Sequence, residues 1–257
     1  MVIPLHDENP TRNIPVVTWM LIAVNVVVFL ASPVVLSPLT RAAAGNLLCE
    51  QVAYYQRWGT IPAELTHGHQ LSEAPGPAVS PTSCAAVPTP YHKNVVLSTL
   101  TGLFIHAGWL HLIGNMLFLW VFGNNVEDRF GRLRFLLFYL TVGVIATCGY
   151  ALATPGSTAP LVGASGAISG ILGAYLMLYP RARVLTLIVV IPIWMRAWFV
   201  LLVWFAIQAI NAQGSLTAGD TSIGYGVHII GFLLGVGYGA LRRLRSPPVD
   251  WTVTPSA

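Results

Sequence analysis

The chain has 257 residues, of which 55% are hydrophobic and only 9% charged, whereas a soluble domain carries about 25% charged residues. Its formal net charge is +4, but the basic residues stand in short clusters between long apolar runs. This pattern is typical of membrane topology signals and argues against a nucleic-acid-binding surface. The composition therefore predicts an all-α integral membrane protein.

Six apolar runs follow one another along the chain, at residues 15–36, 111–126, 135–153, 164–179, 197–211 and 223–241. The first is too long for a signal peptide and lacks a clear cleavage site, so we expect a retained helix. The second, fourth and fifth are short, and their ends are expected to lie inside the protein at membrane depth. Between the fourth and fifth runs, Val184 to Trp194 is apolar but interrupted by Pro192, which suggests a segment along the membrane interface.

The distribution of basic residues predicts the orientation of these six spans. Ten of them fall on the side of both termini, and only Arg41, Arg57 and Lys93 fall on the other side, all in one loop. Because basic residues favour the cytoplasmic side, both termini are expected in the cytoplasm of a multi-pass protein of the cell membrane. The prediction is a tail at residues 1–14, a six-helix membrane domain at residues 15–241 and a tail at residues 242–257. A long external loop occupies residues 37–106.

This loop contains Cys49 and Cys84. They could form a disulfide if the loop faces an oxidising compartment, and two free thiols are the alternative. Clusters of proline and serine between residues 74 and 90 predict irregular structure there.

Polar residues stand out in and beside the apolar runs, where they are costly and usually functional. His106 precedes the second run, and His111 and Asn115 lie within it, four residues apart on one helical face. Ser165 opens the fourth run, and His228 lies in the sixth. These three runs all pass from the outside inward, so Ser165, His111 and His228 are expected at comparable depth in the outer leaflet.

Small residues could bring the fourth and sixth runs into close contact. Each run carries a ridge of glycines at helical spacing, Gly166, Gly170 and Gly173 on one and Gly231, Gly235 and Gly239 on the other. Such packing would place Ser165 within hydrogen-bond reach of His228. A hydroxyl beside an imidazole is the arrangement that a serine nucleophile and its general base require.

Each polar residue also has a structural interpretation. Ser165 could be a helix N-cap or a small packing residue. His228 could form an interhelical hydrogen bond, and His111 with Asn115 could be a buried polar clamp. Ser169 is expected to pack, with its hydroxyl bonded to a backbone carbonyl. Asp220, eight residues before His228, could orient the imidazole or be a solvated loop acid.

Taken together, three motifs resemble the rhomboid family of intramembrane serine proteases. They occur in the family's order and on its second, fourth and sixth spans, as His106-x4-His111-x3-Asn115, Gly163-Ala-Ser165-Gly166 and His228-x2-Gly231-x3-Gly235. The resemblance covers roughly residues 94–241. Val227 departs from the pattern, because the family usually has alanine before this histidine.

The resemblance implies a six-helix rhomboid-like bundle that cleaves transmembrane segments of other proteins near the outer leaflet. It implies that Ser165 is the nucleophile, that His228 is the base, and that an acyl-enzyme forms. The oxyanion hole and the lining of the site would come from His111, Asn115, Gly163, Ala164 and His106. No cofactor or metal is implied. The partners are transmembrane protein substrates and the lipid bilayer, and the oligomeric state is left open.

Three other functions are compatible with these residues. A noncatalytic relative that binds client proteins would keep the fold without needing the serine. A small-solute transporter could use intramembrane polar residues, but the inverted repeats common in transporters are not evident. A metal site made of His106, His111 and His228 lacks a local ligand motif, and the first two do not share a helical face.

Overall fold

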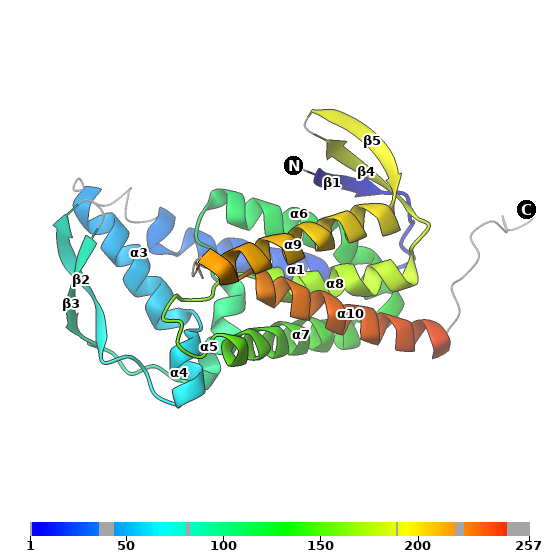
Figure 1. Cartoon of the computed structure of the whole chain (residues 1–257). Helices are drawn as coiled ribbons and strands as arrows, with labels where there is room; N and C mark the ends of the chain where they lie inside the picture. Colours follow the sequence, from blue (N-terminus) through cyan, green and yellow to red (C-terminus); the bar gives the residue numbers. More distant parts are fainter. Residues whose placement is uncertain (1, 36–43, 81–82, 189, 219–223, 246–257) are drawn as a thin grey trace, which may run out of the picture.

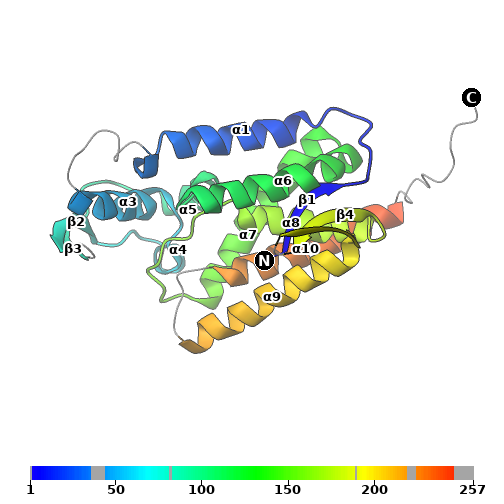
Figure 2. The same ribbon diagram turned by 90° about the horizontal axis from the view of Figure 1, so that it is seen from above.

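The structure, a computed structural model, describes residues 2–35, 44–80, 83–188, 190–218 and 224–245. Long apolar helices within these residues form a bundle (Figure 1), and each overlaps one of the predicted runs. They are α1 (Val16–Leu30), α6 (Trp109–Phe130), α7 (Arg132–Ala153), α8 (Ser165–Leu178), α9 (Ala197–Ala218) and α10 (Tyr225–Arg245). Figure 2 shows α1 and α9 on opposite sides of the bundle. Most residues of α8 are buried, so this helix forms the centre of the bundle.

Length and hydropathy identify which helices could cross a membrane alone. Among the described residues, α7 and α10 meet both requirements. The segments Val95–Phe104 and Trp109–Phe130 meet them together, although they join at a bend of 80°. The helices α1 and α8 and the first part of α9 are apolar but shorter. With 14 residues, α8 extends about 21 Å, less than the ~30 Å hydrocarbon layer of a bilayer.

The described residues are mostly helical, but they also form two small antiparallel sheets, which corrects the prediction of an all-α fold. One sheet has the order β1 (Val2–Asp7), β4 (Arg183–Ile188) and β5 (Ile191–Arg196). It combines the predicted N-terminal tail with the segment that the sequence predicts to lie along the interface. In β4, the alternate residues Val184 and Thr186 are fully buried, which is the period of two that a half-covered strand requires.

Residues 44–80 and 83–104 form a second layer, which lies at the end of the bundle opposite the β1-β4-β5 sheet (Figure 1). Its elements are α3 (Ala44–Trp58), α4 (Pro62–His67), β2 (Glu73–Ser80), β3 (Ser83–Pro88), α5 (Val95–Thr101) and the short helix η1 (Gly102–Phe104). The part predicted to be irregular is the β2-β3 hairpin. Its register shifts between Pro75 and Ala78, as expected where prolines lack the N–H that a ladder needs. A disulfide joins Cys49 on α3 to Cys84 on β3, with 5.7 Å between their Cα atoms.

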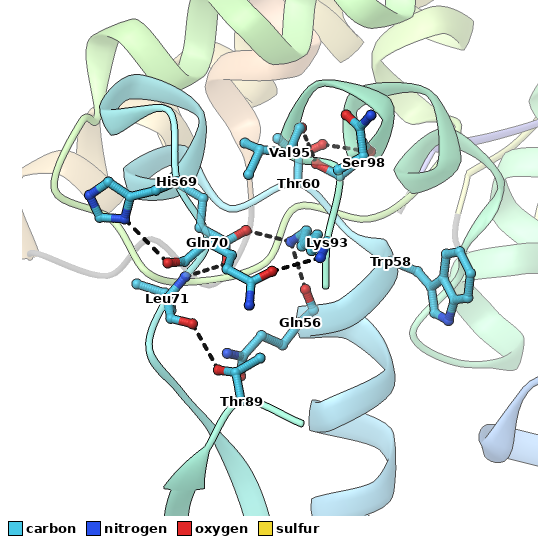
Figure 3. Close-up of polar contacts among 12 residues, drawn as sticks. Gln56, Trp58, Thr60, His69, Gln70, Leu71, Thr89, Lys93, Val95 and Ser98 are labelled. Atoms are coloured by element: carbon cyan, nitrogen blue, oxygen red, sulfur yellow. Dashed lines mark hydrogen bonds and ion pairs between the residues drawn. The ribbon is translucent and has the colours of Figure 1, made fainter. Parts of the chain in front are cut away.

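A buried ion pair ties this layer together. The Lys93 ammonium contacts the Glu64 carboxylate, and both side chains are almost inaccessible to solvent. Figure 3 shows Lys93 beside two further partners: its Nζ donates to the carbonyl of Gln56 at 2.6 Å, and its backbone N–H donates to Oε1 of Gln70 at 2.6 Å. Burial lowers the pKa of Lys93, and the contact with Glu64 opposes this effect. The pair is therefore well supplied with hydrogen bonds, as a buried charge requires.

Buried carboxylates attach the N-terminal segment to the bundle. Glu127 on α6 accepts hydrogen bonds from two backbone N–H groups in the first turn of α1 and from the hydroxyl of Thr18. It thus satisfies donors that a helix start leaves unpaired. Asp7 at the end of β1 accepts from Asn125 at 2.7 Å and from Tyr175 at 2.8 Å. Burial raises the pKa of Asp7 to about 6.

Candidate active site

Helices α8 and α10 pack with their backbones in contact, because glycines of each helix face the other. A Cβ atom added at Gly231 would overlap the carbonyl oxygen of Gly166, and one added at Gly235 would lie 2.7 Å from the carbonyl carbon of Gly170. Any side chain at these positions would force the helices apart. Val227 fills the space beside Gly166, where an added Cβ would lie 2.6 Å from its Cγ1.

This packing brings Ser165 and His228 together. Ser165 is the first residue of α8, and His228 lies in the first turn of α10. The Ser165 Oγ lies 2.8 Å from the His228 Nε2, within ordinary hydrogen-bond distance. Both side chains are only partly buried. The hydroxyl therefore faces a group that can accept its proton.

A possible oxyanion donor lies beside the serine. Nδ1 of His111 accepts a hydrogen bond from the backbone N–H of Ala107 at 3.3 Å. An accepting Nδ1 carries no proton, so the ring proton of the neutral imidazole resides on Nε2. A Cβ at Gly163 would lie 2.8 Å from that Nε2 and 3.7 Å from the Ser165 Oγ. Gly163 has φ +123°, a conformation that favours glycine. Asn115 uses one amide N–H on the carbonyl of His111 at 2.8 Å, and its amide carries a second.

The remaining predicted residues have supporting positions. His106 is 1% exposed and packs against the ring of His111, with 5.0 Å between ring centroids. It is not among the residues that line the cavity described below, and its contact with the site is through the ring of His111. Ala164 is fully buried directly before the serine. Ser169 donates its hydroxyl to the carbonyl of Ser165 at 2.6 Å, so the prediction that it packs with a back-bonded hydroxyl is confirmed.

His228 has a second polar partner in the structure, which was not predicted from the sequence. Nδ1 of His228 lies 2.8 Å from Oε1 of Gln208 on α9. Asp220, the candidate from the sequence for this position, lies outside the described residues. The sequence does contain a signal for Gln208, because it is a polar residue within the apolar run at residues 197–211, where polar side chains are usually functional.

These groups open into a cavity of about 450 Å³ between α6, α8, α9 and α10. Its polar lining includes Ser165, His228, His111, Asn115 and Gln208, and its apolar lining includes Phe118, Leu172 and Trp204. An apolar pocket with a few converging polar groups is typical of a binding site for a substrate. Within the described part of the chain, no three His, Cys, Asp or Glu side chains gather as a metal site would need.

Comparison with known proteins gives consistent matches. Residues 93–245 match the family model of the Rhomboid domain. Rhomboid protein 1, mitochondrial, of Saccharomyces cerevisiae is 35% identical over 147 residues, which are 56% of this chain and 41% of that protein. Presenilin-associated rhomboid-like protein A, mitochondrial, of Danio rerio is 32% identical over 177 residues, 63% of this chain and 43% of that protein. Rhomboid protease GluP of Bacillus subtilis is 44% identical over 77 residues, 30% of this chain and 15% of that protein.

The chain thus spans less than half the length of these three relatives. The match to the family model nevertheless covers more than half of the chain and includes Ser165, His228, His111 and Asn115. The resemblance found in the sequence is confirmed, and the chain belongs to the rhomboid family of membrane proteins.

Proposed function

We propose that this protein is a serine endopeptidase that cleaves transmembrane segments of other membrane proteins. The observation that carries the proposal is the 2.8 Å contact between Ser165 Oγ and His228 Nε2 in the wall of a substrate-sized cavity. The donor groups beside the serine add support, since acyl transfer needs them. Relatives that bear the name rhomboid protease support the same class of reaction.

The proposed reaction follows from this geometry. The Ser165 hydroxyl gives its proton to His228 Nε2 while Oγ attacks the scissile carbonyl carbon. The resulting oxyanion accepts hydrogen bonds from His111 Nε2–H and from the backbone N–H of Ser165, which has no partner among the described contacts at the start of α8. His228 then protonates the leaving amine as the peptide bond breaks. Water, deprotonated by His228, hydrolyses the acyl-enzyme and restores the serine. No step requires a cofactor.

The membrane arrangement is part of the proposal. All six long helices would cross the bilayer of the cell membrane. The β1-β4-β5 sheet and both termini would then lie in the cytoplasm. The excess of basic residues at that end supports this orientation. The disulfide between Cys49 and Cys84 supports an external, oxidising location for residues 37–106. Ser165 would then lie in the outer leaflet.

The substrate must expose a carbonyl that a helix normally hides in hydrogen bonds. The preferred segments should therefore unwind easily, and the family resemblance adds a preference for small residues at the cut. A cavity of about 450 Å³ has room for a short extended stretch of such a segment.

The test is cleavage of a model transmembrane substrate by the purified protein in detergent. Wild type is expected to cleave, whereas Ser165→Ala and His228→Ala are expected to lose the activity. Ser169→Ala is the matched control, because this serine lies one turn away and bonds only locally in the described contacts. Undiminished cleavage by Ser165→Ala or His228→Ala would overturn the proposal.

Two further outcomes would identify the alternatives. A wild-type protein that binds the substrate stably, cleaves nothing and resists labelling by a serine-directed fluorophosphonate would be a noncatalytic client-binding protein. Solute uptake into proteoliposomes without cleavage would identify a transporter.

A further inference from the structure

We propose that Gln208 is a positioning residue that holds His228 in the tautomer needed to accept the serine proton. The inference rests on the proposed function and adds α9 to the helices α6, α8 and α10, which already contribute residues to the proposed machinery. Gln208 lies on α9, whereas Ser165 and His228 lie on α8 and α10. The side chain is partly buried and lines the same cavity.

The geometry specifies the tautomer. His228 has Nδ1 at 2.8 Å from Gln208 Oε1 and Nε2 at 2.8 Å from Ser165 Oγ. An amide oxygen can only accept a hydrogen bond, so Nδ1 must carry the ring proton. Nε2 then presents its lone pair to the serine hydroxyl, as a general base must. The opposite tautomer would present an N–H to that hydroxyl and could not take its proton.

The other described neighbours of the His228 ring do not replace Gln208 as the hydrogen-bond partner of Nδ1. Trp204 and Tyr225 flank the imidazole, each with 6.2 Å between ring centroids, and Trp204 has no acceptor to offer. Among the residues that the structure describes, the titratable groups that face His228 are His111 from α6 and Tyr225 from its own helix, while α8 and α9 contribute the neutral Ser165 and Gln208. Without Gln208, the described contacts leave Nδ1–H with no partner, and the preference between the tautomers is lost.

The amide also suits the charged stage of the reaction. Once Nε2 has taken the serine proton, both ring nitrogens carry hydrogen, and Gln208 Oε1 continues to accept from Nδ1. The ring is therefore held in one orientation while it passes the proton to the leaving amine. A neutral amide provides this restraint without adding a negative charge that would favour the protonated ring.

The experiment measures kcat, KM and the pH profile of substrate cleavage for two variants. Gln208→Leu removes the acceptor at similar size, and kcat is expected to fall about 100-fold with little change in KM. Gln208→Glu keeps an acceptor in the same place, so kcat should recover at neutral to alkaline pH. Because a carboxylate favours the protonated imidazole, the acidic limb of its profile should move to higher pH. Asn211→Leu, on the same helix and outside the cavity lining, should behave as wild type.

The outcomes separate the two proposals. Wild-type kcat in Gln208→Leu would overturn the positioning role and leave the dyad standing. A loss in Gln208→Leu that Gln208→Glu does not restore would show that packing, and not the hydrogen bond, is what matters, which also overturns it. If Gln208→Leu fails to fold, the pH profile of Gln208→Glu decides: an acidic limb at the wild-type pH would overturn the positioning role. An inactive, unlabelled wild type would refute the proposed function and this inference together.

Discussion

Substituting alanine for Gly231 tests whether the contact between α8 and α10 sets the geometry of the site. The new Cβ would overlap the carbonyl oxygen of Gly166 and lie 3.1 Å from its carbonyl carbon. A helical carbonyl cannot turn away, so the helices must separate by about 1 Å to reach ordinary contact distances. The Ser165–His228 hydrogen bond, now 2.8 Å, would lengthen to roughly 3.5 Å or more, where it no longer serves proton transfer.

The expected loss is about 100-fold in kcat/KM, the usual consequence of displacing a catalytic group by about 1 Å. Overpacking costs about 1–3 kcal/mol, and the better helix propensity of alanine returns up to about 1 kcal/mol. The variant should therefore remain folded with a modestly lower Tm. Cleavage of a transmembrane substrate, fluorophosphonate labelling of Ser165 and thermal unfolding in detergent measure these three effects.

The control lies on the same helix. Gly237→Ala places its Cβ where no described atom lies within 4 Å, so the rate should match the wild type. Its Tm should equal or slightly exceed that of the wild type, because alanine has the better helix propensity. If Gly231→Ala keeps wild-type kcat/KM and Tm while folding normally, the glycine contact does not control the distance between serine and histidine.

Three predictions concern stability, each measured by unfolding in detergent. Replacing both Cys49 and Cys84 with serine should lower the free energy of unfolding by about 2–4 kcal/mol; a Tm equal to that of the oxidised wild type would contradict this. Burial raises the pKa of Asp7 from 3.8 to about 6. The protonated form of Asp7 therefore stabilises the fold fully below pH 3.8, and this stabilisation is lost as the pH rises through 6. Asp7→Asn should remove this pH-dependent part of the free energy of unfolding, about 2–3 kcal/mol in total. The same pH dependence in the variant as in the wild type would contradict the prediction. Lys93→Met should cost about 3–5 kcal/mol by stranding Glu64; adding Glu64→Gln should recover most of the loss, and a failure to recover would argue against stranding.

The helices and the serine–histidine contact can be predicted because their signals are local. A continuous apolar run marks each long helix, and the order of the runs assigns a direction to each. Those directions alone predict that Ser165, His111 and His228 lie at one depth. The glycines four residues apart indicate which helix faces meet.

The strands cannot be predicted in the same way. β1 and β4 are each six residues long and pair across about 180 residues of chain, so neither segment shows its partner. The apolar content of β4 also resembles that of an interfacial helix. In the β2-β3 hairpin, proline and serine suggest a loop, but the hairpin packs on α3 and is joined to it by the Cys49–Cys84 disulfide. Tertiary contacts override local preference there.

The layer formed by residues 44–104 also has a part in the site. The backbones of Thr60 and Leu161 exchange two hydrogen bonds, at 3.0 and 2.6 Å, and Gly163 N–H donates to the carbonyl of Gly102 at 2.9 Å. These bonds hold the non-helical segment that leads to Ser165, where Gly163 adopts φ +123°. Thr60 lies before residue 93, where the match to the family model begins. The approach of the backbone to the serine is therefore fixed partly by a segment outside the family-defining region, and variation in that segment can alter the site without any change in the motifs.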